Sequence, residues 1–243
     1  MRTGLFVVVL AIVCAFTASM VYADMQGDID RAATIINEFK QMPEQSIPPA
    51  VLEKAQGLAI ITIGKGGFIL SARGGGGVLL VKTATGWSAP SSVVVGGAGL
   101  GFQIGADVTD FVFVLNSPMA VDAFRKGGNV TIGGNLNATA GPIGRAAEAD
   151  IGTSAIFAYS RSKGLFAGVS AEGTVLAEGK KTNELFYGRP ITAEEVLSGT
   201  VPPPASASAL YSALSAYVVK GEAVTTTTTT TTSAAPATAA TTK

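Results

Sequence analysis

Glycine clusters inside apolar, β-branched segments constrain the fold of this 243-residue chain more than any other feature. Glycine accounts for 30 residues, well above the usual ~7%. Many of them interrupt the runs LAIITI, GFILSA, GVLLVKT, SSVVVGGAGLGFQIGA and TDFVFVLN, which are typical of β-strands. Glycine inside a strand indicates curvature, a bulge or the close approach of another backbone. We therefore predict a curved, glycine-rich, mainly antiparallel β-sheet or small barrel-like sheet, with GKGG at residues 64–67 as a hairpin turn.

Helical patterns flank this sheet and interrupt it once. Ser117 followed by Pro118 is typical of a helix start, and Thr192 with Glu195 resembles a capping box. Further strands are predicted between these two points, as far as about Ala177. The predicted helices cover residues 28–42, 47–57, 117–128, 192–199 and 207–219. The sequence thus predicts an α+β fold, with N- and C-terminal helices and one inserted helix packed on the sheet.

The amino-acid composition excludes most catalytic chemistries. The chain has no histidine, and Cys14 is its only cysteine, so imidazole bases, catalytic triads and thiolate metal sites are not expected. The carboxylates that remain are interpreted as structural: Asp107, Asp110, Asp122, Glu148 and Asp150. Seventeen basic and seventeen acidic residues cancel, which gives no general attraction for nucleic acid. We expect no enzyme activity, no cofactor, no metal and no nucleic-acid partner.

The two ends of the chain differ from its middle. Residues 1–23 combine Arg2, an apolar run of twelve residues and Val21-Tyr22-Ala23, a pattern typical of a signal peptide cleaved after Ala23. A secreted or extracytoplasmic protein is therefore predicted, with peripheral membrane association compatible with it. A helical segment at 24–54 and a domain at 55–220 follow. Residues 221–243 are rich in threonine and alanine and are expected to be disordered. Asn129 and Asn137 match the N-glycosylation pattern.

Basic and aromatic residues late in the chain are the candidate binding residues. Arg161 and Lys163 flank a turn that carries Phe166, and Arg145 lies upstream. Positive charge beside an aromatic ring favours contact with anionic lipid headgroups. Trp87, the only tryptophan, lies in a turn between Gly86 and Pro90, where it either covers the core or anchors the protein at an interface.

Several sequence blocks resemble one known family in the right order. They are AQGLAIITIGKGGFILSARGGGGVLLVK (55–82), GWSAPS (86–91), GLGFQIGADVTDFVFVLN (99–116), AGPIGR (140–145), YSRSKGLFAGVSAEG (159–173) and FYG (186–188), preceded by Asn183. From about Ala55 to Leu214 the chain resembles the SYLF domain family, which includes yeast actin-binding proteins and plant FYVE-containing proteins. The resemblance implies a non-enzymatic, membrane-associated module. Relatives bind phosphoinositides, often through an N-terminal amphipathic helix, and some bind and bundle actin filaments.

The residues and the resemblance together predict a phospholipid-binding module, with phosphoinositides among the candidate lipids. The expected partner is an anionic phospholipid or membrane surface. Residues 24–42 hold four acidic residues against Arg31 and Lys40, so this helix lacks the positive face that anionic lipid attracts. The alternative is a protein-interaction module of the actin-filament-binding type, with actin-like filaments as the less favoured partner.

Overall fold

The computed structural model describes residues 24–42, 46–126, 130–131, 139–140 and 154–226. The predicted signal peptide, both candidate glycosylation sites, Arg145 and most of the predicted tail lie outside these ranges. The domain boundaries proposed from the sequence therefore stay predictions.

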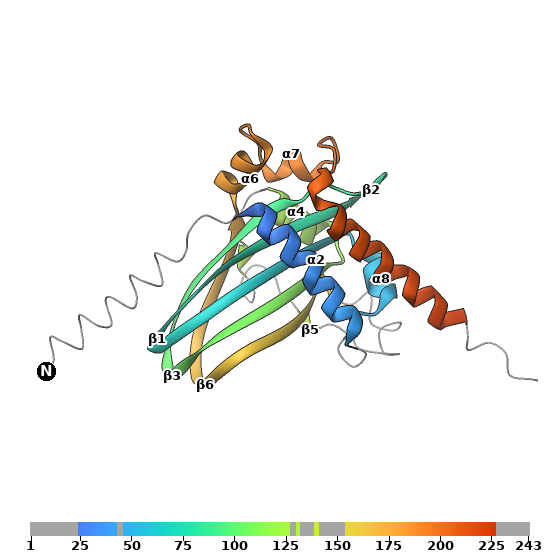
Figure 1. Ribbon diagram of the computed structural model, residues 1–243. Helices are drawn as coiled ribbons and strands as arrows, with labels where there is room; N and C mark the ends of the chain where they lie inside the picture. The colour runs from blue at the N-terminus through green and yellow to red at the C-terminus, as the bar shows by residue number, and fades with distance from the viewer. Residues whose placement is uncertain (1–23, 43–45, 127–129, 132–138, 141–153, 227–243) are drawn as a thin grey trace, which may run out of the picture.

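Three very long strands form the body of the protein (Figure 1). The strands are β1 (Gly57–Thr83), β2 (Gly86–Trp87), β3 (Ser91–Leu115), β4 (Val130–Thr131), β5 (Thr139–Ala140) and β6 (Ile156–Glu178). The helices are α2 (Met25–Gln41), α3 (Pro49–Lys54), α4 (Pro118–Arg125), α6 (Lys180–Tyr187), α7 (Ala193–Leu197) and α8 (Ser208–Thr226). The sheet order is β2-β1-β3-β6-β4, with β5 parallel to β6 and the other pairs antiparallel. The predicted α+β fold is confirmed.

The long strands fold back on themselves near their midpoints. In β1 the register with β3 shifts between Phe68 and Leu70. The two halves of the strand then lie side by side, and the amide of Lys82 donates to the carbonyl of Gln56 at 2.8 Å. β3 pairs with β1 on both sides of this shift, and β6 pairs with β3 without interruption. All three strands therefore bend together. Figure 1 shows the bent ends of β1, β3 and β6 projecting away from the helices.

Glycine makes this close return of β1 possible. A Cβ on Gly75 would collide with the carbonyl oxygen of Thr62, and one on Gly77 with that of Ile60. No other residue lets two backbones approach so closely. The predicted hairpin turn at residues 64–67 is wrong, because these residues pair with residues 105–108 inside the continuous ladder of β1 and β3.

The alternation of side chains along the sheet creates two cores. Leu58 and Ile60 face α2, α3 and α8, where they pack with Ile36, Phe39 and other helix residues. The residues between them in sequence, such as Ala59 and Ile61, face the inside of the folded sheet. Helices α4 and α7 contribute to this second core through Val121, Phe124 and Leu197, among others. Successive side chains of one strand therefore point alternately into the two cores.

Helix α2 packs along the folded sheet and contributes seven buried residues to the first core. Asp24 caps the helix by accepting a hydrogen bond from the amide of Gln26 at 3.1 Å. One turn later, the Oδ2 atom of Asp28 is buried without a hydrogen-bond partner in the described structure. It lies against Gly76 of β1. Burial raises the pKa of Asp28 to about 6; nearby Arg31 lowers the pKa and Asp24 raises it further.

Two glycines of the same sheet provide a matched test of the folded strand. We expect Gly77→Ala to lower the free energy of unfolding by about 3 kcal/mol, because the new methyl group meets the backbone of the other half of β1. Gly96→Ala is the control, because its Cβ would have no atom within 4 Å. Urea denaturation measures both variants. Equal stability of the two would contradict the close return of β1.

Asp28 predicts a pH dependence of stability. Its native pKa of about 6 is above the ordinary value of 3.8, so protonation favours the native state as pH falls through about 6. We expect Asp28→Asn to stabilise the protein at about pH 7.5 by about 1 kcal/mol, after allowing for solvent screening of a partly exposed carboxyl. The gain should shrink towards pH 5. Thermal unfolding of both proteins across this range measures the difference in stability. A gain that stays constant with pH would exclude the ionisation of Asp28 as its cause.

Candidate functional site

Arg161, a candidate lipid-binding residue, connects helix α2 to the sheet. Its guanidinium forms an ion pair with Glu38 of α2 and another, at 2.9 Å, with Asp110 of β3. Asp110 also accepts a hydrogen bond at 2.7 Å from the hydroxyl of Thr62 on β1. The side chains of Arg161 and Asp110 are only 15% and 7% exposed. The hydrogen bond to Glu38 is the largest of the effects that raise the pKa of Arg161.

This network gives Arg161 a clear structural task. A guanidinium that already has two carboxylate partners keeps α2 in register with β3 and β6. Its direct contact with lipid stays a prediction.

Trp87 ends the short strand β2, where it is half buried and packs against the core beneath the helices. The ammonium of Lys82, its partner across the β1–β2 pair, lies 5.6 Å from the centre of the indole ring. A cation over an indole face is favourable. Trp87 therefore partly covers the core and keeps an exposed edge.

The residues after Trp87 are held by side chains from the C-terminal helices. The fully buried Asn183 of α6 accepts from the amide of Ser92 at 2.8 Å and donates to the hydroxyl of Ser91 at 3.1 Å. Tyr187 donates to the carbonyl of Pro90 at 2.6 Å, and Tyr211 of α8 donates to that of Ser88 at 2.9 Å. Two sequence blocks of the resemblance, GWSAPS and the FYG segment after Asn183, thus form one structural unit.

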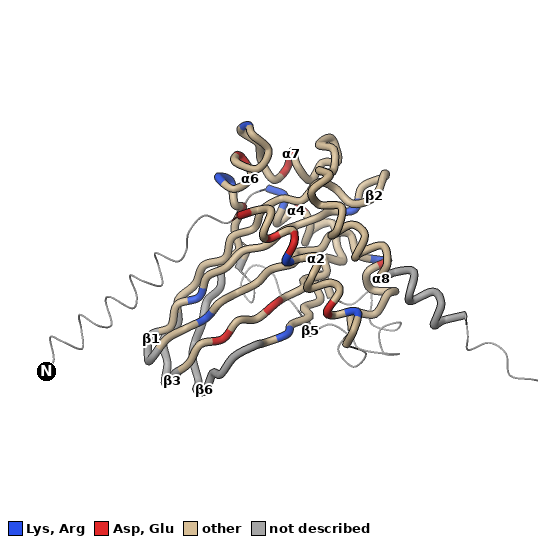
Figure 2. Tube along the Cα trace, viewed as in Figure 1, with Lys and Arg blue, Asp and Glu red and all other residues tan. Residues whose placement is uncertain are grey.

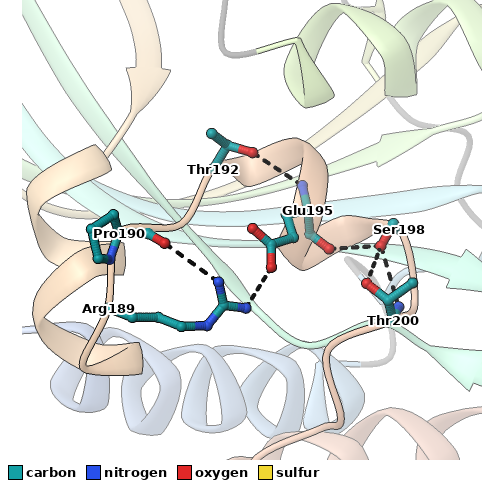
Figure 3. Close-up of polar contacts among 6 residues, drawn as sticks. All are labelled: Arg189, Pro190, Thr192, Glu195, Ser198 and Thr200. Atoms are coloured by element: carbon teal, nitrogen blue, oxygen red, sulfur yellow. Dashed lines mark hydrogen bonds and ion pairs between the residues drawn. The ribbon is translucent and has the colours of Figure 1, made fainter.

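The corner around α7 is also closed by local polar contacts (Figure 3). Thr192 caps the helix by accepting from the amide of Glu195 at 3.2 Å, which confirms the predicted helix start. The carboxylate of Glu195 accepts from Arg189 instead of returning to the cap. These exposed contacts shape the corner.

The projecting part of the sheet is the best candidate for a functional surface. We call it the folded end and define it as residues 65–73 of β1, 97–107 of β3 and 164–174 of β6, which pair row by row. Phenylalanine, leucine, isoleucine and valine are frequent in these segments: Phe68, Ile69, Leu70, Leu100, Phe102, Ile104, Leu165, Phe166 and Val169. In Figure 1 the described helices cover the opposite half of the sheet.

Charged residues border the folded end. Burial and the positive charge of Arg73 lower the pKa of Lys65, and the nearby Asp107 partly offsets this. Burial would raise the pKa of Asp107, but hydrogen bonds from Ser162 and Thr109 and the charge of Lys65 hold it below its ordinary value. Figure 2 shows basic and acidic positions across the long strands between the helices and the folded end. Lys65 and Arg73 thus place two positive charges close together on the two halves of β1.

The structure brings only some of the candidate residues together. The backbone of Phe166 lies in the folded end opposite Gly105, and that of Lys163 pairs with Val108 at its border. Val108 is 42% exposed. Trp87 is far from them. Its strand partner Lys82 is hydrogen-bonded to Gln56. Gln56 precedes Lys65, at the edge of the folded end, by nine residues, or about 30 Å along a strand.

Lys65 and Arg73 are border residues that the sequence interpretation did not include. Both belong to the glycine-rich block 55–82, where the expected hairpin turn concealed their proximity. Among the described residues, the structure contains no group of three or more potential metal ligands.

Comparison with known proteins identifies the family. Residues 96–217, about half of the chain, match the family described as Ysc84, "Las17-binding protein actin regulator". The chain belongs to the Ysc84 (SYLF) family. It is 44% identical over 209 residues to human "SH3 domain-containing YSC84-like protein 1" and 45% identical over 201 residues to "LAS seventeen-binding protein 3" of Saccharomyces cerevisiae. These alignments cover 82% and 78% of this chain but 61% and 44% of the relatives.

The family membership corrects the predicted location. The family description concerns actin regulation, which takes place inside cells, and no name among these relatives indicates export. The prediction of a secreted or extracytoplasmic protein is therefore wrong. The signal-peptide interpretation behind it concerns residues outside the described ranges and gains no support from the comparisons.

Within the described residues, the helices are too short or too polar to span a lipid bilayer.

The Arg161 network predicts a stability effect that is separate from binding. We expect Arg161→Met to lower the free energy of unfolding by about 2 to 3 kcal/mol, because Asp110 loses its ion pair while it remains buried. Lys181→Met is the control, since Lys181 is 72% exposed in its pair with Glu184 and should change stability by less than about 0.5 kcal/mol. Urea denaturation provides the stabilities, and hydrogen exchange should show faster opening of α2 in the Arg161 variant only. Unchanged exchange in α2 would contradict the anchoring role.

Proposed function

We propose that this Ysc84-family chain is a non-catalytic module that binds anionic phospholipid surfaces through the folded end of its sheet. The observation that carries the proposal is the coincidence of three features at one place. The folded end projects beyond the described helices, its segments are rich in large apolar residues, and Lys65, Arg73 and Lys163 border it.

Apolar and basic residues act on a membrane in different ways. Large apolar and aromatic side chains gain free energy when they enter the boundary between headgroups and acyl chains. Basic residues near an anionic leaflet add about 1 kcal/mol each, and salt weakens this contribution. A narrow projecting sheet can bring both kinds of residue to a flat surface without steric interference from the helices. The chain's lack of net charge is compatible with such a local site.

Electrostatics at the border favour anionic headgroups. Burial is the largest cause of the lowered pKa of Lys65, and repulsion by Arg73 adds to it. A headgroup phosphate between them would replace this repulsion by two attractions. Phosphoinositides carry more phosphate than other phospholipids and are therefore the preferred lipid class within the proposal. Arg161 is not part of the proposed contact surface, because Glu38 and Asp110 hold it.

The proposal predicts a salt-sensitive interaction with vesicles. We expect the protein to sediment with vesicles that contain an anionic phospholipid and to be released as salt rises from about 50 mM to about 500 mM. Lys163→Glu and Phe166→Ser should each reduce the bound fraction several-fold, because one reverses a border charge and the other removes an aromatic ring. Lys181→Glu makes the same charge change on α6, away from the folded end, and should bind as the unaltered protein does. Equal loss in all three variants would contradict a localised site.

A second candidate function is a protein-interaction module of the actin-filament-binding type. The observation that favours it is the description of the matched family as an actin regulator. The chain spans less than two thirds of the human and yeast relatives, so activities of those whole proteins reach this chain only as proposals. Cosedimentation with purified actin filaments separates the two functions. Filament binding that survives Phe166→Ser, together with no binding to vesicles, would favour the second candidate.

A further inference from the structure

A groove lies at the opposite end of β1 from the folded end. It has a volume of about 450 Å³ and opens between the end of α3, both termini of β1 and the helix α4. Its lining combines charged and apolar residues from these three elements. The folding of β1 creates the groove, because the Gln56–Lys82 hydrogen bond joins the beginning and the end of the strand.

The groove combines positive charge with an apolar lining. The charged residues of its lining are three basic ones, Lys54, Lys82 and Arg125, and two acidic ones, Glu53 and Asp122. Lys82 is positioned by donating to the carbonyl of Glu53 and by its contact with the ring of Trp87. Ala55, Val81, Pro118 and Val121 supply the apolar contacts.

Arg125 has spare capacity for hydrogen bonding. Its Nε atom is buried and has no hydrogen-bond acceptor in the described structure. A buried guanidinium nitrogen without an acceptor is unfavourable. A carboxylate is an acceptor that suits a guanidinium, because two parallel hydrogen bonds can form between them.

The lining indicates a peptide in preference to a membrane. A concave groove does not fit a flat bilayer surface, whereas a peptide segment can enter it. The groove lining has three basic and two acidic residues, and apolar residues lie beside them. This lining complements a peptide in which acidic and apolar side chains alternate. A volume of about 450 Å³ lies in the range of small-ligand sites and accommodates a few residues.

We propose that this groove binds a short acidic peptide segment of a partner protein. A carboxylate of the segment accepts from Arg125 and Lys82, and a neighbouring apolar side chain packs on Val81 and Val121. Lys54 adds attraction at the edge. The site is separate from the proposed lipid surface and does not depend on it, because the folded end is about 30 Å away along β1.

Trp87 makes the proposal directly measurable. It is the only tryptophan of the chain and contacts Lys82, so its fluorescence reports on the groove. The probe is a capped hexapeptide of alternating glutamate and leucine. The comparison ligands are a hexapeptide of alternating lysine and leucine, inorganic phosphate, and vesicles with an anionic phospholipid. Isothermal calorimetry serves as the second measurement, in case binding leaves the indole emission unchanged.

We expect saturable binding of the acidic peptide that weakens with salt, and no saturable binding of the basic peptide. Arg125→Gln should weaken the acidic peptide about tenfold, because the guanidinium charge that lines the groove is lost. Asp122→Asn should strengthen it about twofold, because one repulsive carboxylate is removed. Lys181→Gln, at an exposed position on α6, should leave the affinity unchanged. Thermal unfolding confirms that each variant is folded before it is titrated.

Three results would overturn the proposal. The first is the absence of binding by both measurements, and the second is equal affinity for the acidic and basic peptides. The third is an affinity that Arg125→Gln leaves unchanged in a folded protein. Binding of phosphate or vesicles at this groove, lost in Arg125→Gln, would reject the peptide and assign the groove to phosphate groups instead. Loss of vesicle binding through the folded end would leave all of these outcomes unaffected.

Discussion

The approach of two backbone segments within β1 is the constraint on which the rest of the structure depends. Gly75 and Gly77 lie so close to the carbonyl groups of Thr62 and Ile60 that any Cβ would collide. Because β3 pairs with both halves of β1, and β6 pairs with β3 along its length, this single contact bends the whole sheet. Bending gives the sheet an inside, filled by residues such as Ile61 and Phe113, and an outside that receives α2, α3 and α8. It also divides the molecule into a helix-covered half and a projecting half (Figure 1).

In the helix-covered half, polar contacts fix the positions of helices on the sheet. Apolar packing alone would allow the helices to slide along it. Arg161 joins α2 to β3, and the buried Asn183 joins α6 to the start of β3. Apolar burial is non-directional, whereas each of these groups has a few partners at defined angles. Loss of one partner would leave a charge or an amide buried without compensation, which makes the alternative positions of the helix costly. The burial of Asp28 against Gly76 adds an opposing contribution, since its raised pKa reflects an unfavourable environment for charge.

Much of this architecture could be predicted from the sequence, because its signals are local. Glycine inside β-branched runs indicated a curved antiparallel sheet, and Thr192 indicated the start of α7. The hairpin expected at residues 64–67 was wrong because glycine permits both a turn and a bend, and only long-range pairing decides between them. For the same reason the sequence did not reveal that Lys65 lies close to Arg73. Lys82 and Arg125 are 43 residues apart and share a groove only because the two ends of β1 meet. The acidic partners of Arg161, Glu38 and Asp110, also come from segments that are distant in the sequence.

The folded strand also determines how the two proposed binding surfaces can coexist on a small module. One lies where the three strands turn back, and the other lies where the two ends of β1 meet, so the length of the strand separates them. If the folded end contacts a membrane, the groove beside Trp87 faces away from it and remains accessible to a protein. The sheet between them is a continuous hydrogen-bonded ladder with a packed interior, which resists bending and keeps this spacing fixed. With this separation, the proposed lipid contact and the proposed peptide contact could form at the same time without steric conflict.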